Sequence, residues 1–304
     1  MSVQAQPLAE PRPLLGVAWM LATGLCFVAV TAIVKHVGGR LPAPEAAFLR
    51  FVFGLILLSP VLLRLQRAEF DRGAWGLFAA RGVVHTFGVM LWFYAMTSIT
   101  LAEVTAMNYM NPLYVTVGAA FFLGETLHKR RLMAIGAALV GAFIILRPGF
   151  REILPGHIAM LGTAVFFAGS YLIAGRLAGR VKPSVVVAMM SVSVTIGLAP
   201  FAAAVWVAPT PEELAWLFAT ACFATLGHFT MTKAFAVAPM TVTQPVTFLQ
   251  LVWSVLLGAV FFAEPVDGWV VLGGMIILAA VSFVTWREAV LKRRVTPVVN
   301  EPRF

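Results

Sequence analysis

Polar side chains recur at helical spacing inside two long apolar stretches of the sequence. Asn108 and Asn111 are three residues apart in the first stretch, and Thr247 and Gln250 have the same spacing in the second. Residues three and four apart lie on one face of a helix. Such a stripe either lines a hydrophilic cavity for a solute or joins helices through hydrogen bonds worth roughly 0.6–2 kcal/mol each. With the neighbouring aromatic residues, the candidate solute contacts are Asn108, Tyr109, Asn111, Thr247, Gln250 and Trp253.

A third stretch carries a cation, an imidazole and an indole on one helical stripe, at Arg81, His85 and Trp92. The guanidinium and the imidazole suit a carboxylate, and the indole suits an aromatic ring. Arg81 could instead extend toward the membrane interface, and His85 could be a packing residue bonded to a carbonyl group. We add Tyr94, the counterpart of Lys233 in the second half of the chain, to the candidate solute contacts.

Four further ionisable residues are candidates for energy coupling or gating. An ionisable side chain at the centre of a bilayer costs at least about 2.5–3.5 kcal/mol unless it faces protein or water. His228 is a candidate proton-linked group because the intrinsic pKa of an imidazole lies near physiological pH. The carboxylate of Glu103 equally suits a helix N-terminus, and Lys233 equally suits the lipid interface. The candidate set is Arg50, Glu103, His228 and Lys233.

The sequence contains none of the motifs that would indicate an intramembrane enzyme or a nucleotide-driven pump. It lacks the His-Glu-x-x-His pair that holds catalytic zinc and the Gly-x-Ser-x-Gly elbow of serine hydrolases. A phosphate-binding P-loop is also absent. We therefore expect no enzyme activity, no cofactor and no metal site, and we keep an intramembrane enzyme only as a remote alternative.

The elements that position these residues are membrane-spanning helices. Of the 304 residues, 61% are hydrophobic and 12% are charged, with a mean hydropathy of +0.92, whereas a soluble domain is about one quarter charged. A helix needs about 20 apolar residues to cross a bilayer. We predict an all-α integral membrane protein with ten transmembrane helices, at residues 14–34, 46–65, 74–96, 101–123, 131–147, 156–175, 184–207, 213–236, 240–263 and 268–286.

The distribution of Lys and Arg predicts the orientation. Fifteen of the 22 lie on the side of the two tails, three lie within spans, and four lie on the opposite side. Because basic residues accumulate in cytoplasmic loops, we predict that both tails are cytoplasmic, in a bacterial-type inner membrane. The net charge of +9 serves this orientation, so we expect no nucleic-acid partner. The four cations predicted to be outside are Lys35, Arg40, Arg147 and Arg151.

The two halves of the chain match weakly, and each contains five predicted spans. Gly88 aligns with Gly227, and Ala95 with Ala234. An odd number of spans makes the second half enter the membrane from the opposite side, as in transporters built from inverted repeats. We predict a tail at 1–13, a repeat at 14–147, an inverted repeat at 156–287 and a basic tail at 288–304.

Short motifs near the helix ends resemble the drug/metabolite transporter superfamily, of the EamA type. Met190 stands where the second half would carry an equivalent of Arg50. The resemblance implies two five-helix repeats and the export or uptake of amino acids, nucleotide-like compounds or vitamins by alternating access. The resembling segments are Phe48-Leu49-Arg50-Phe51, Leu123-Gly124-Glu125, Leu146-Arg147-Pro148-Gly149 and Phe262-Ala263-Glu264.

The balance of charges within the spans favours an anionic solute. Three intramembrane cations, Arg50, Arg81 and Lys233, face one clear acid, Glu103. We therefore predict a secondary transporter that exports an amino acid or a related carboxylate-bearing solute. The alternative is an uptake transporter for a vitamin or nucleotide-like compound such as riboflavin or S-adenosylmethionine. The expected partners are the solute and the lipid bilayer, and the sequence is compatible with a homodimer.

Overall fold

The computed structural model describes residues 12–64, 72–123, 129–177, 181, 183–238 and 240–295. Residues 1–11 and 296–304, which include most of both predicted tails, lie outside the described residues, as do Gly124 and Glu125. The described chain is helical. Its helices are α1 Pro13–Val37, α2 Ala43–Leu62, α3 Arg72–Ser98, α4 Leu101–Asn108, α5 Asn111–Leu123, α6 Lys129–Leu146, α7 Pro155–Leu177, α8 Pro183–Ala204, α9 Pro211–Val237, α10 Met240–Thr243, the short 3₁₀ helix η2 Gln244–Thr247, α11 Phe248–Phe262 and α12 Gly268–Val295.

Seven of the described helices are long and apolar enough to cross a membrane, and Phe248–Phe262 is a shorter apolar helix. The ten predicted spans therefore do not correspond to ten continuous apolar helices. The fourth predicted span is divided into α4 and α5, and the ninth into α10, η2 and α11. The fifth corresponds to α6, whose first three residues are Lys129, Arg130 and Arg131, so its apolar part is short.

The two divided spans are interrupted at corresponding places, each next to a proline. Tyr109 and Met110 form a turn between α4 and α5, just before Pro112. Pro112 has no N–H to offer to a carbonyl of the preceding turn, which disfavours a continuous α-helix there. In the other half, η2 contains Pro245. Irregular backbone at membrane depth is tolerated where it is buried in protein or lines a water-filled cavity, so these breaks are the natural places for a solute site.

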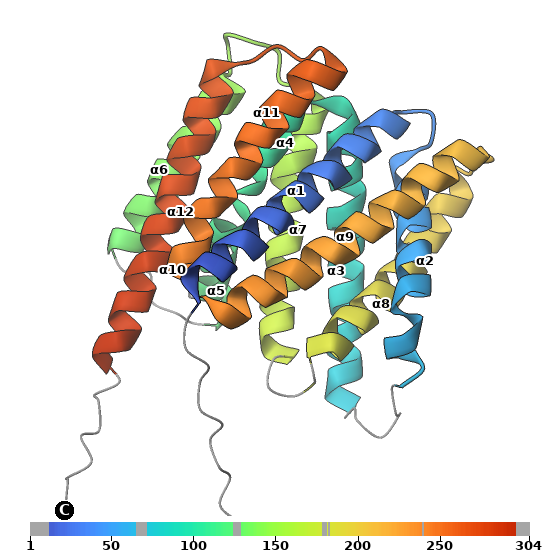
Figure 1. Cartoon of the computed structure of the whole chain (residues 1–304), viewed down its shortest axis with the longest axis horizontal. Coiled ribbons are helices and arrows are strands. Elements are labelled where there is room, and N and C mark those ends of the chain that lie inside the picture. The colour runs from blue at the N-terminus through green and yellow to red at the C-terminus, as the bar shows by residue number, and fades with distance from the viewer. Residues whose placement is uncertain are drawn as a thin grey trace, which may run out of the picture.

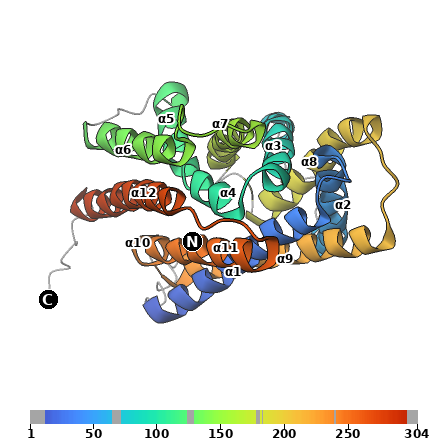
Figure 2. The same cartoon turned by 90° about the horizontal axis from the view of Figure 1, so that it is seen from above.

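The main helix pairs each combine one helix from the first half of the chain with one from the second half. Helix α1 packs against α9 and α3 against α7, while α2 pairs with α8, α6 with α12 and α4 with α11. In Figure 2, α6, α5, α7 and α3 form one row, and α12, α11, α1 and α9 form the other. Figure 1 shows α6 beside α12 at one edge, and α2 and α8 at the other. The long helices of each half therefore have their main partners in the other half.

Glycines allow the α6–α12 pair to approach closely. A Cβ atom added to Gly141 would lie 2.7 Å from the carbonyl oxygen of Gly273, and one added to Gly273 would lie 2.5 Å from that of Gly141. Small residues at such contacts are typical of helices packed in membranes. Large apolar side chains such as Phe121, Phe143 and Val260 are exposed on the outside of the bundle, as expected for a surface in contact with lipid.

Candidate functional site

A buried hydrogen-bonded group connects α3 with α7 and α8. Arg81, which is only 6% exposed, donates from Nε to Ser170 Oγ at 3.3 Å and from Nη1 to the carbonyl of Val186 at 3.1 Å. The Ser170 hydroxyl also lies 3.1 Å from His85 Nδ1. Arg81 therefore points across the interface between the halves, toward α7 and the first turn of α8. Ser170, on α7, holds the two predicted α3 side chains in place.

Aromatic side chains cover one side of this group. The ring of His85 stacks on Phe167, with centroids 4.8 Å apart and an interplanar angle of 23°. Trp92 meets the same Phe167 edge to face at 6.1 Å. The Nε1 atom of Trp92 is buried and has no hydrogen-bond partner in the described part of the chain. The predicted Arg81–His85–Trp92 stripe thus faces α7 as one unit, and it carries an unused donor.

Two of the predicted coupling residues join this group from neighbouring helices. The charges of Arg50 and Arg81 act electrostatically on both His85 and His228. Arg50, on α2, lies over the ring of Phe51 at 4.1 Å. We call Arg50, Arg81, His85 and His228 the basic cluster. The ionisable groups that act electrostatically on His85 are the other three members of this cluster, and all of them are bases.

Polar contacts also join the two helix breaks. Asn111 Nδ2 donates to Asn108 Oδ1 at 2.7 Å, and the Tyr109 hydroxyl donates to the carbonyl of Thr247 at 2.8 Å. Asn111 is 8% exposed, and its Oδ1 has no hydrogen-bond partner among the described residues. Gln250 faces α1, where Gly24 leaves room beside it. Part of the predicted stripe therefore joins helices, and part offers unused polar groups.

Three predicted residues do not lie with the others. Tyr94 is 42% exposed, on the same side of α3 as exposed Phe87. Trp253 is 36% exposed, on the same side of α11 as exposed Leu256. Both faces carry large apolar side chains typical of lipid contact. The structure thus brings neither aromatic ring to the basic cluster.

Lys233 likewise lies on an exposed part of α9. Its ammonium group lies over the ring of Phe229 at 5.4 Å, and Phe229 is itself exposed. A long cationic side chain beside an exposed aromatic ring is the arrangement expected near a lipid interface.

Glu103 lies at the face where α1, α3, α6, α8 and α11 end, which is the face predicted to be outside. It completes a capping box with Thr100 at the start of α4 and forms an ion pair with Arg151. The main-chain N–H of Leu154 donates to His157 Nδ1 at 3.0 Å. His157 Nε2 lies 3.3 Å from Glu103 Oε1 and also contacts Nη2 of Arg151. Glu103 therefore has its partners at the end of the bundle.

Each of the four cations at this face has a carboxylate partner. Besides the Arg151–Glu103 pair, the remaining ion pairs are Lys35–Glu264, Arg40–Glu213 and Arg147–Asp267. We call these four pairs the end-face network.

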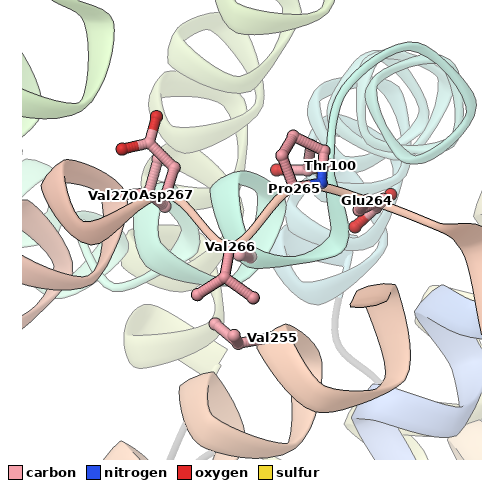
Figure 3. A pocket seen from close by; sticks show the side chains of 8 residues that line it. Thr100, Val255, Glu264, Pro265, Val266, Asp267 and Val270 are labelled. Carbon is pink, nitrogen blue, oxygen red and sulfur yellow. The ribbon is translucent and has the colours of Figure 1, made fainter. Parts of the chain in front are cut away.

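Glu264 and Asp267 also line a small pocket with Thr100, Val255 and Val270. Figure 3 shows the two carboxylates on opposite sides of this pocket, separated by Pro265 and Val266.

The fold is that of a multi-span membrane protein in which helices of the two halves pack against one another. The family model of the EamA-like transporter family matches residues 14–147 and again residues 154–286. The chain therefore belongs to the EamA-like transporter family, of the drug/metabolite transporter superfamily. This confirms the resemblance seen in the sequence motifs.

The chain is also similar to several named bacterial transporters. It is 28% identical to an S-adenosylmethionine uptake transporter of Rickettsia bellii, covering 90% of this chain and 94% of the relative. It is 28% identical to a riboflavin transporter of Rhizobium johnstonii, covering 96% and 98%. It is 26% identical to a pseudopaline exporter of Pseudomonas aeruginosa, covering 87% and 94%.

A solved crystal structure shares the fold, with a TM-score of 0.57 and 20% identity over 93% of this chain and 98% of the other. The named relatives agree on the transport of a small metabolite and differ in the metabolite and in its direction. The protein is a small-metabolite transporter, and the relatives are named as transporters rather than as enzymes.

Proposed function

We propose that the protein is a secondary transporter that exports a small carboxylate-bearing solute, such as an amino acid, by alternating access. In this proposal the halves at 14–147 and 156–287 are inverted repeats of five membrane-crossing segments each. Both tails, 1–13 and 288–304, are cytoplasmic in a bacterial-type inner membrane. The observation that carries the proposal is the basic cluster, in which the buried side chains of Arg81 and His85 share the Ser170 hydroxyl and the groups that act electrostatically on His85 are all bases.

The basic cluster favours a negatively charged partner, because its member Arg81 is buried. Removing a cation from water is costly unless an opposite charge accompanies it. Neither Glu45 nor Glu103 is among the groups that act electrostatically on His85. Glu45 Oε2 accepts the Val207 main-chain N–H at 2.9 Å while its Oε1 has no partner among the described residues, and Glu103 pairs with Arg151. A carboxylate on the solute would supply the missing charge.

Arg81 has hydrogen-bond donors left for such a solute. A guanidinium has five N–H donors, and among the described residues two of those of Arg81 are used, by Ser170 and Val186. The remaining donors match the two oxygens of a carboxylate. Trp92 Nε1 and Asn111 Oδ1 add a buried donor and a buried acceptor for the rest of the solute.

The second candidate is uptake of a flat vitamin or nucleotide-like compound. The stacked His85 and Phe167 with Trp92 would suit a planar ring, and the chain resembles a riboflavin transporter and an S-adenosylmethionine uptake transporter. The basic cluster favours a carboxylate over the sulfonium of S-adenosylmethionine. Because the sequence contains no P-loop, an ion gradient or exchange is the simplest energy source in either case. A homodimer stays a prediction.

The test is counterflow in proteoliposomes loaded with unlabelled neutral, aromatic or acidic amino acids, riboflavin or S-adenosylmethionine. We expect exchange of an amino acid by the native protein and by Lys233→Gln, which removes a cation outside the cluster. We expect Arg81→Gln to lose this exchange. Exchange of riboflavin or S-adenosylmethionine alone would reject the carboxylate assignment and favour the second candidate. Efflux from preloaded cells, compared with uptake, then tests the direction.

A further inference from the structure

The end-face network connects the two halves of the chain at one end of the bundle. Lys35, at the end of α1, pairs with Glu264, after α11. Arg40, in the loop after α1, pairs with Glu213, on α9. Arg147, at the end of α6, pairs with Asp267, before α12. Each of these three pairs therefore joins the first half to the second.

The fourth pair, Arg151–Glu103, is linked to the Arg147–Asp267 pair through Asp267. Arg151, in the segment connecting α6 to α7, pairs with Glu103 and lies 3.8 Å from Asp267 Oδ2. His157, at the start of the second half, lies 3.3 Å from the Glu103 carboxylate. This pair thus extends the link between the halves across the connecting segment.

Glu264 forms the most central link. Its carboxylate pairs with Lys35 and also accepts the main-chain N–H of Leu101 at 2.9 Å. Lys35 in turn donates to the carbonyl of Ile99 at 2.6 Å. Lys35 and Glu264 together therefore hold the α3–α4 junction, α1 and the α11–α12 loop in contact. The side chains of Lys35 and Glu264 are 18% and 10% exposed, so water screens this pair less than an ordinary surface pair.

The backbone beside these pairs is held in an unfavourable conformation. Among the described residues, the two non-glycine residues with φ in the left-handed region are Arg147, with φ of 43°, and Ala263, with φ of 51°. Arg147 is itself a member of the network, and Ala263 directly precedes Glu264. Such conformations persist where surrounding contacts impose them, and they cluster at switch regions. The ion pairs therefore hold the ends of α6 and α11 in one arrangement.

We infer that the end-face network is a gate, and that the described structure is the state in which this face is closed. The inference deepens the proposed function, on which its role in alternating access rests. For this face to open, Lys35 must separate from Glu264, and Arg147 and Arg151 must separate from Asp267. The two halves can then move apart at this end of the bundle. Released from the network, Arg147 and Ala263 are free to relax. The gate belongs to the face predicted to be outside.

The test measures how fast a cysteine beneath the gate reacts with a charged, membrane-impermeant thiol reagent. Ser254 is a suitable reporter because it is fully buried on α11 and bonded to Thr105 Oγ1, on α4, at 2.7 Å. The reporter Ser254→Cys is made in a Cys26→Ser/Cys222→Ser background. The gate is weakened by Glu264→Gln with Asp267→Asn, and Arg130→Gln, on the first turn of α6, removes a charge at the opposite end as a control.

We expect the weakened gate to react about tenfold faster when the reagent is applied from the gate face, which corresponds to about 1.4 kcal/mol. The control should react at the rate of the unmodified gate. A rate in the weakened gate within twofold of the control, or an equal rise from both faces, would overturn the inference.

The outcome is separable from that of the proposed function. The reaction of the Ser254→Cys reporter requires no solute, so it tests the gate even where no carboxylate is transported. Conversely, counterflow that fails for every carboxylate would reject the proposed solute while the one-sided reporter reaction still supports the gate.

Discussion

The Ser170 hydroxyl offers a sharp test of how the basic cluster is organised. Ser170→Ala removes the oxygen that lies 3.3 Å from Arg81 Nε and 3.1 Å from His85 Nδ1. A hydrogen bond to a charged group contributes about 1.5–3 kcal/mol, and each 1.4 kcal/mol is about tenfold in affinity. If this bond fixes Arg81 for a carboxylate, its loss should raise the half-saturating solute concentration about tenfold to a hundredfold.

The measurement is counterflow over a range of solute concentrations, compared with a matched serine on a neighbouring helix. Ser191, on α8, is also buried, but its hydroxyl donates to the carbonyl of Val187 in its own helix at 3.2 Å. Ser191→Ala should leave the half-saturating concentration within about twofold of the native value. Equal effects of the two substitutions would show that Ser170 serves general packing, and would refute the reasoning.

Three further predictions concern the fold. Gly141→Ala should lower the free energy of unfolding by about 1–3 kcal/mol, because the added methyl group overpacks the contact with Gly273. The measurement is thermal unfolding in detergent, and the control is Gly136→Ala, which should change little because no neighbour lies within 4 Å. Equal melting temperatures for the two variants would contradict the close approach of α6 and α12. Pro112→Ala should leave a folded protein with reduced counterflow, because it restores an N–H that favours a continuous helix; unchanged transport would show that the break does not shape the site. Thr100→Ala should cost about 1 kcal/mol of unfolding free energy by removing the cap of α4, whereas Thr100→Ser should retain it; the prediction fails if the serine variant is equally destabilised.

The helices and the stripe on α3 could be predicted from local sequence because they depend on local patterns. Apolar stretches of about 20 residues identify spans, and the spacing of Arg81, His85 and Trp92 places them on one face. The interruption before Pro112 follows from the missing N–H of proline. Ser170 could be identified only as a polar residue within a span, because its partners come from α3, far away in the sequence.

The inward face of each helix was harder to predict. Apolar side chains cover nearly the whole circumference of these helices. The sequence therefore indicates how deep a residue lies in the membrane, but it does not indicate whether its side chain faces the protein interior or the lipid. Tyr94, Trp253 and Lys233 are at suitable positions along their helices but lie on exposed faces. The end-face network was also beyond local sequence, because pairs such as Lys35–Glu264 depend on how the loops of the two halves meet.

The most direct test of the central claim compares a carboxylate-bearing solute with its amide. The two molecules have nearly the same size and shape and differ in the charge that the basic cluster is proposed to bind. In counterflow with the native protein, we expect exchange of the carboxylate form and at least about tenfold weaker exchange of the amide. Arg81→Gln should remove this preference. Equal exchange of both forms by the native protein would contradict the claim that the basic cluster selects an anionic solute.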